Sequence, residues 1–305
     1  MSIPFIALFY YQLMDTRQLE YFTAVAAELN VTEASHRLFV AQSTVSAGLR
    51  SLERELGVRL FERTTKSVRL TDAGEELLPR AQQILDQVEA LRVLAGQADG
   101  GLRGRLRLGI FSGLEQIGNL PAVLRDLRLR FPGIEVSLTA SASGSLGLSD
   151  DLSHGRLDAA FVAVPPSPEL DAVELLSADY VAVLPSEHRL ANQPAVSLAE
   201  LAGEPWVEVP AGYGNRIQLE AALTGLGLSR QIVAEVPGLP AVAGYVAAGL
   251  GVAVIPKVVP FSGCTVRPLS DELPAWRLQI ATRTGSARRP VLQALIQLFG
   301  EHNDT

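Results

Sequence analysis

The N-terminal part of the chain carries short helical patterns separated by tight breaks, and this feature constrains the fold most. Apolar residues at helical spacing predict a first helix over residues 16–28: Leu19, Phe22, Val25 and Leu29. Thr32 is expected to cap a second, short helix whose Ala34 and Leu38 face inward. After a tight turn at residues 39–41, a third helix is expected to bury Val45, Leu49, Leu52 and Leu56. This arrangement predicts a helix-turn-helix.

The exposed face of the third helix has the chemistry of a DNA-reading surface. It carries short hydrogen-bonding side chains, one methyl group and one arginine: Gln42, Ser43, Thr44, Ser46, Ala47 and Arg50. Such groups suit base edges and phosphates at the N-terminal end of a recognition helix. We include Thr32 among the candidate DNA contacts. The alternative is an ordinary solvated helix in a bundle.

A cationic hairpin is predicted directly after the third helix, which Gly57 ends. Residues 60–63 and 68–70 are expected to be short strands joined by residues 64–67. Arg63, Lys66 and Arg69 would then lie against the DNA backbone or the minor groove, where they add affinity more than sequence specificity. The hairpin extends the prediction to a winged helix-turn-helix over residues 15–72.

The overall charge hides this local chemistry. The 305-residue chain has a net charge of −7, which is unusual for a DNA-binding protein, yet cations outnumber anions between Thr32 and Leu70. The single cysteine, Cys264, excludes an intramolecular disulfide and favours a reducing, cytoplasmic compartment. Residues 1–14 are interpreted as a disordered or mis-assigned leader, since they lack the basic start of a secretory signal and are too short to span a bilayer. No membrane association is expected.

A dimerisation helix is predicted after Thr71, its expected N-cap. Small and large apolar residues alternate at spacings of four and three, which forms a heptad seam: Leu77, Ala81, Ile84, Val88, Leu91 and Ala95. The remaining surface is polar, so the seam needs a partner helix, either in a second subunit or in its own chain. We expect residues 73–101 to form this linker helix and a hinge.

Strand and helix patterns alternate from Leu102 onward, which predicts a two-lobed α/β domain over residues 102–305. We place the first lobe at about 102–170 and 268–305, and the second at about 171–267. Ligands of open α/β sheets bind at the carboxyl ends of strands. The candidate effector contacts are therefore glycines, serines and a proline that follow predicted strands: Ser112, Gly113, Ser141, Ser143, Gly144, Gly212 and Pro237. Each of these could instead be a plain loop residue or helix cap.

Several runs resemble the LysR-type transcriptional regulators. In the N-terminal part they are Arg17-Gln18-Leu19-Glu20-Tyr21-Phe22, Ala41-Gln42-Ser43-Thr44-Val45-Ser46, Leu52 to Arg63, and Leu70-Thr71-Asp72-Ala73-Gly74. Two details depart from the common pattern: Ala41 stands where a serine or threonine cap is frequent, and Gly48 lies inside the third helix at a cost of roughly 1 kcal/mol relative to alanine. In the C-terminal part the matching runs are Gly104 to Gly109, Gly155 to Ala160, and Ala248 to Pro256.

The resemblance implies a multidomain α/β protein with a periplasmic-binding-protein-like effector domain and two crossovers between its lobes. It also implies double-stranded promoter or operator DNA as a partner, a small-molecule effector, and a homodimer that assembles into a tetramer. RNA polymerase is a further candidate partner.

Catalysis, a metal centre and a cofactor are not expected. The four histidines are scattered, and the Gly249-Leu250-Gly251 run precedes a predicted strand, which does not fit a dinucleotide site. A peroxide-sensing member of the family would be expected to carry a cysteine pair. Two other classes remain as alternatives: a periplasmic solute-binding protein, and an α/β enzyme with an accessory helical domain.

Overall fold

The structure is a computed structural model that describes residues 14–63, 68–97, 103–117, 119–286 and 290–303. The chain divides into two compact units, Met1–Leu91 and Arg92–Thr305. Residues 1–13 of the predicted leader, Lys66 and most of the predicted hinge lie outside the described residues. None of the helices in the described ranges is long and apolar enough to cross a membrane.

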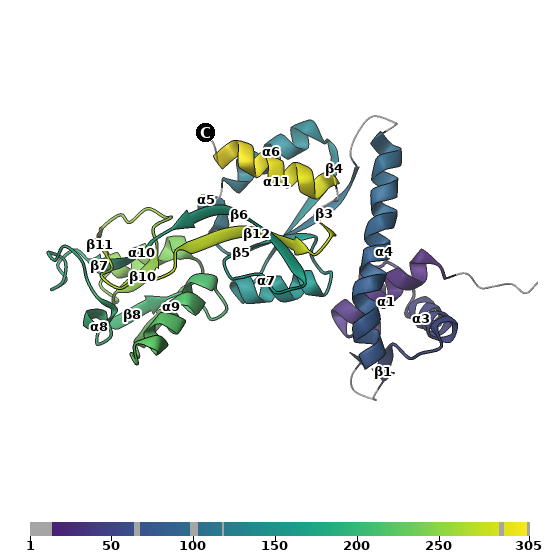
Figure 1. The fold of residues 1–305 in the computed structure, drawn as a ribbon, viewed down its shortest axis with the longest axis horizontal. Coiled ribbons are helices and arrows are strands. Elements are labelled where there is room, and N and C mark those ends of the chain that lie inside the picture. Colours follow the sequence, from purple (N-terminus) through teal and green to yellow (C-terminus); the bar gives the residue numbers. More distant parts are fainter. Residues whose placement is uncertain (1–13, 64–67, 98–102, 118, 287–289, 304–305) are drawn as a thin grey trace, which may run out of the picture. The chain divides into compact units, whose positions relative to one another are not determined.

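The first unit is a winged helix-turn-helix (Figure 1). Its elements are α1 (Thr16–Glu28), α2 (Val31–Arg37), α3 (Gln42–Leu56), β1 (Phe61–Arg63), β2 (Val68–Leu70) and α4 (Asp72–Gln97). The core includes Phe22, Val25, Val45, Leu49 and Leu52, all at most 1% exposed. The rings of Phe22 and Phe61 meet edge to face at 5.6 Å and join α1 to the wing.

Two expectations for this unit were wrong in detail. The N-cap of α2 is Asn30, whose side-chain oxygen accepts from the backbone N–H of Thr32 at 2.9 Å. Asn30, and not Thr32, is the N-cap because it directly precedes the first turn of α2. Its side-chain acceptor therefore reaches the free N–H groups of that turn. Leu56 is 37% exposed, since it is the last residue of α3 and lies beyond the core, directly before the left-handed C-cap Gly57.

The apolar residues of the linker helix α4 fall into a buried group and an exposed group. Thr71 caps the helix, accepting from the N–H of Gly74 at 3.0 Å. Leu78 and Ala81 are buried in the core of the first unit, with Leu77 packed against it. Ile84 and Leu91 are 38% and 67% exposed, and Val88 is half-buried. The beginning of the seam therefore packs on its own chain, and the exposed apolar residues start at Ile84. The side chain of Ala95 is not among those described.

Among the described residues, the second unit contains three sheets. The first has the order β4-β3-β5-β12-β6, the second the order β10-β7-β11, and the third is the pair β8-β9. An isolated bridge between Trp206 and Val252 links the pair β8-β9 to the segment that leads into β10. The strand bounds are β3 (Arg103–Ile110), β4 (Gly133–Ala140), β5 (Ala159–Val162), β6 (Leu170–Ala178), β7 (Tyr180–Pro185), β8 (Pro205–Glu208), β9 (Gln231–Glu235), β10 (Ala253–Pro256), β11 (Cys264–Pro268) and β12 (Trp276–Arg283).

Helices cover both faces of the first sheet, with α6 and α11 on one side and α7 on the other (Figure 1). The edge-to-face contact between Phe161 of β5 and Phe299 of α11, at 5.1 Å, lies in this core. The helices of the unit are α5 (Leu114–Ile117), α6 (Leu120–Arg130), α7 (Gly144–Ser153), α8 (Leu198–Leu201), α9 (Gly214–Gly225), α10 (Leu239–Ala247) and α11 (Pro290–Asn303).

The strands β6 and β11 were not predicted, and because β6 was not predicted the expected end of the first lobe at about residue 170 is too early. β6 pairs with β12 along its whole length, so residues 170–178 belong to the first sheet and the chain crosses to the second lobe after Ala178. It returns between Pro268 and Trp276. β6 is an edge strand whose residues are mostly exposed or half-buried, so it lacks the apolar alternation by which buried strands are recognised.

Candidate DNA-binding surface and effector site

The predicted reading face of α3 is open. Gln42, Ser43, Thr44, Ala47 and Arg50 are exposed, and Ser46 is half-buried. Ala41 is the N-cap of α3 and provides no side-chain acceptor. The N–H of Thr44 donates to the carbonyl of Ala41 at 2.9 Å, so the N–H groups of Gln42 and Ser43 are those that an external acceptor such as a phosphate could take. Thr32 is exposed at the start of α2.

The wing adds positive charge beside this helix. β1 and β2 pair antiparallel, with Glu62 opposite Arg69, and Arg69 is exposed. Arg63 is the last residue of β1, but its side chain is not described, and Lys66 lies in the part of the hairpin outside the described residues. Of the three wing cations predicted from sequence, the structure thus places the side chain of one.

The effector candidates of the first lobe lie at the carboxyl ends of two parallel strands. Ser112 and Gly113 follow β3, while Ser141, Ser143 and Gly144 follow β4 and lead into α7. The N–H of Ser141 donates to the carbonyl of Ile110 at 3.0 Å, which ties the two loops together. Ser112 and Ser141 are half-buried, and Ser143 is exposed.

The candidate effector residues of the second lobe contact those of the first lobe. The N–H of Leu146 donates to the carbonyl of Gly212 at 3.1 Å. Gly212 has a φ of +90°, and a Cβ there would stand 2.3 Å from the carbonyl oxygen of Ser143. Gly238 has a φ of +85°, and its Cβ would stand 2.5 Å from the carbonyl oxygen of Ser112. Pro237 precedes Gly238 and is exposed. The loops of the two lobes therefore touch through backbone, which only glycine allows at these positions.

Aromatic residues that the sequence analysis did not select also line this boundary. Tyr213 is 4% exposed, and its ring meets that of Phe111 edge to face at 6.2 Å. A Cβ on Gly144 would stand 2.7 Å from the same tyrosine ring. Both aromatics adjoin a selected glycine or serine in sequence, but their pairing joins segments about 100 residues apart and left no local pattern to detect.

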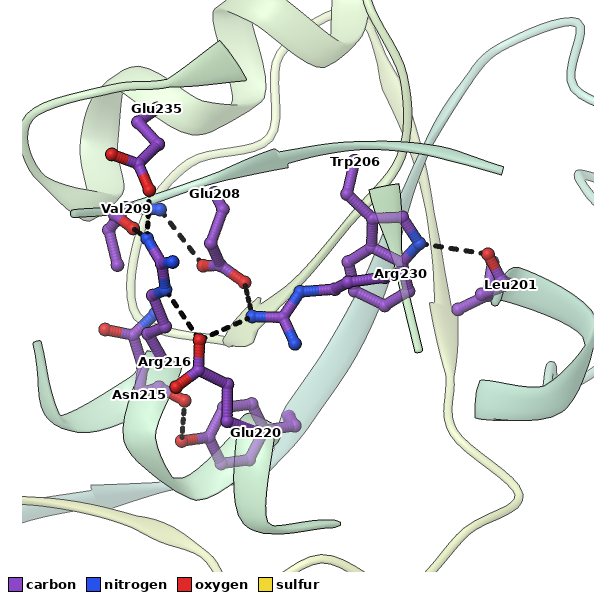
Figure 2. A network of polar contacts seen from close by, with 10 residues as sticks. Leu201, Trp206, Glu208, Val209, Asn215, Arg216, Glu220, Arg230 and Glu235 are labelled. Carbon is purple, nitrogen blue, oxygen red and sulfur yellow. Dashed lines mark hydrogen bonds and ion pairs between the residues drawn. The ribbon is translucent and has the colours of Figure 1, made fainter. Parts of the chain in front are cut away.

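A buried ion-pair network joins the carboxyl ends of β8 and β9 to α9 and to Arg230, which directly precedes β9 (Figure 2). Glu208 is 1% exposed and pairs with Arg230 at 3.0 Å, and the Arg230 guanidinium stacks 5.5 Å from the centre of the Trp206 ring. Arg230 also contacts Glu220 of α9 at 3.4 Å. Burial raises the pKa of Glu208 to about 7, although the positive charge of Arg230 opposes this shift.

The same network holds the loop that reaches the first lobe. Arg216 donates to the carbonyl of Val209 at 2.9 Å and pairs with Glu220 at 2.9 Å and with Glu235. The carboxylate of Glu208 accepts from the N–H of Val209 at 3.0 Å. Val209 begins the loop that contains Gly212, so these charges fix the end of β8 to the start of α9.

Cys264 is part of the fold of the second lobe. It is half-buried on β11, its thiol donates to the carbonyl of Ala243 at 3.1 Å, and burial raises its pKa. A thiol with a raised pKa is a poor nucleophile. No group of three or more metal-ligating side chains gathers within the described ranges.

Family models match both parts of the chain. The model of the bacterial regulatory helix-turn-helix protein, lysR family, covers residues 16–75, and that of the LysR substrate binding domain covers residues 99–304. The chain belongs to the LysR family. It is a transcriptional regulator with a helix-turn-helix DNA-binding domain and an effector-binding domain, as the sequence analysis predicted.

This LysR-family regulator is 36% identical to the HTH-type transcriptional regulator ShiR of Corynebacterium glutamicum (strain R), over 66% of this chain and 68% of ShiR. It is 32% identical to a probable hydrogen peroxide-inducible genes activator of Streptomyces viridosporus, over 93% of both chains. Its structure resembles that of a full-length OxyR mutant from Pseudomonas aeruginosa, with a TM-score of 0.70, 28% identity, and coverage of 94% and 97% of the two chains. The family and these relatives are regulators and not enzymes.

Proposed function

We propose that this LysR-family regulator binds double-stranded promoter or operator DNA through α3 and the wing. Gln42, Ser43, Thr44, Ser46 and Ala47 read bases, with Thr32 beside them. The cations Arg50, Arg63, Lys66 and Arg69 hold phosphates. The single observation that carries the proposal is the open, uncapped N-terminal end of α3.

The regulator acts as a homodimer that pairs through α4, and two dimers form a tetramer. The exposed Ile84 and Leu91, 38% and 67% exposed on an otherwise polar helix, support this pairing. A dimer presents two recognition helices to two half-sites. We assign residues 15–72 to DNA binding, 73–101 to the linker, and 102–305 to effector binding. The protein works in the cytoplasm, where RNA polymerase is a further partner.

A small, polar effector binds between the lobes near Ser112, Gly113, Ser141, Ser143, Gly144, Gly212 and Pro237. Close backbone contacts between the loops of the two lobes support this position. A ligand that binds one arrangement of the lobes more tightly shifts the population toward it, and the shift would change how the dimers lie on DNA.

A mobility-shift titration tests the DNA-binding proposal. The purified full-length protein is titrated against the DNA upstream of its own gene and against a random duplex, at two salt concentrations. We expect tight, salt-sensitive retention of the upstream fragment. Equal retention of both duplexes would leave a DNA-binding protein whose operator lies elsewhere. Retention of neither would contradict the proposal.

A further inference from the structure

A hollow at the C-terminal end of α3 lies next to the proposed reading face. It is lined by Ala47, Arg50, Glu53, Arg54, Gly57, Val58 and Arg59. Ala47, Arg50 and Arg54 are three and four residues apart, so they follow one face of α3. Ala47 and Arg50 also belong to the proposed DNA contacts, and the hollow therefore continues that surface toward the wing.

Among the described residues, no carboxylate pairs with the three arginines of the hollow. Arg50, Arg54 and Arg59 are exposed, and none of them forms an ion pair with a residue that the structure describes. The one side-chain hydrogen bond among them runs from Nε of Arg54 to the carbonyl of Arg50 at 3.3 Å. Elsewhere in this acidic chain guanidinium groups are commonly paired, as Arg107 is with Asp158 and Arg130 with Glu301.

Glu53, the acidic residue of the hollow, forms hydrogen bonds with backbone N–H groups. An oxygen of the Glu53 carboxylate accepts from the N–H of Leu60 at 2.9 Å and from that of Phe61 at 3.4 Å. Thr71 donates its hydroxyl to the carbonyl of Arg59 at 2.6 Å. The segment that carries Arg59 is therefore held from two sides, and its position relative to α3 is fixed before any ligand arrives.

We propose that Arg54 and Arg59 form a phosphate-binding site for the DNA backbone in this hollow, in addition to the contacts at the start of α3 and in the wing. The inference rests on the proposed DNA-binding function and deepens it. A phosphodiester fits because it offers negative oxygens to several guanidinium donors at once. The site adds affinity without reading sequence.

If Arg54 only stabilises the end of its helix, its replacement should lower stability and leave the salt dependence of DNA binding unchanged. Arg54 lies in the last turn of α3, where a cation stabilises the helix end. Arg128 occupies the same kind of position in the last turn of α6 and is also exposed. Arg128→Ala removes an equal charge from an equivalent helix end in the other unit, and it serves as the matched control.

The test measures the binding of full-length protein to a fluorescein-labelled random duplex, by anisotropy at several salt concentrations. For the double variant Arg54→Ala/Arg59→Ala we expect several-fold weaker binding and a salt slope reduced by about 0.9 for each lost phosphate contact. Arg54→Lys/Arg59→Lys should keep most of the slope, and Arg128→Ala all of it. Melting temperatures of all variants confirm that they fold.

The outcomes distinguish the phosphate site from the DNA-binding function on which it rests. Wild-type binding with an unchanged slope in the double alanine variant would overturn the phosphate site and leave DNA binding by α3 intact. Weaker binding to the upstream DNA alone, with the random duplex unaffected, would assign the hollow to sequence reading and also overturn the site. If the wild-type protein retained neither duplex, both proposals would fail.

Discussion

The ring of Tyr21 on α1 lies directly against Gly48 in the middle of α3. A Cβ at position 48 would stand 2.4 Å from Cδ2 of Tyr21, and the tyrosine is only 8% exposed. Glycine thus lets the two helices approach closely. The conformational cost of this glycine follows from its place in a helix, but its purpose does not, because the purpose depends on a residue on another helix.

Gly48→Ala should therefore destabilise the first unit, by about 1–3 kcal/mol, because the buried ring has to move. This sign is opposite to the usual gain from removing a helical glycine. Gly244→Ala on α10 is the control, since a Cβ there meets open space and should stabilise its helix by about 0.5–1 kcal/mol. Urea denaturation of both variants measures the change in the free energy of unfolding, which should be negative for Gly48→Ala and positive for Gly244→Ala. A more stable Gly48→Ala protein would refute the close packing.

Ala41→Ser should stabilise α3 by about 1 kcal/mol, because a serine hydroxyl at the N-cap accepts from a free N–H of the first turn. Ala41→Val adds bulk without an acceptor and should give no such gain. The change in melting temperature distinguishes the two. Equal melting temperatures for serine and valine would show that the first turn already has its acceptors.

Leu91→Lys should weaken self-association, because it places a charge on the exposed part of the seam on α4. Leu226, which is 52% exposed at the end of α9, provides the control variant Leu226→Lys. Sedimentation equilibrium of both proteins measures the dissociation constant. Dimers of equal strength would exclude Leu91 from the interface.

Gly212→Ala should loosen the contact between the lobes, because its Cβ would clash with the carbonyl of Ser143. Gly227 also has a positive φ, of +67°, but a Cβ there meets nothing within 4 Å, so Gly227→Ala shares only the backbone strain. Hydrogen exchange at the amide of Leu146, which donates to Gly212, should become faster in the first variant alone. Equal rates in the two variants would contradict this.

Glu208 should make stability depend on pH. Its pKa rises from an ordinary 4.5 to about 7 on folding, so the folded state binds a proton more tightly than the unfolded state. The resulting stabilisation is complete below pH 4.5 and is lost as the pH rises to about 7, with a maximum of about 3 kcal/mol. Glu208→Gln cannot titrate and should flatten this part of the profile. Denaturant titrations across this pH range measure both proteins, and parallel profiles would exclude Glu208 as the source.

Much of the fold could be predicted because local patterns specify its elements. The predicted bounds of α1 agree with the structure, Gly57 ends α3, and Thr71 caps α4. The glycines and serines after the strands could be selected because strand ends point to one edge of a sheet. The strand β6 could not be predicted, since an exposed edge strand is specified by its pairing with β12, about 100 residues later, and not by its own pattern.

The sequence by itself determined the family, the bounds of the first helix, the alternation of strands and helices in the second unit, and the polar character of the third helix. These are properties of neighbouring residues and of periods that one segment can display. The tertiary structure alone decided which half of the α4 seam is buried, why position 48 is glycine, and that Glu208 meets Arg230. Such relationships join segments that are distant in sequence, and their energies come from packing and desolvation, which exist only after the chain has folded.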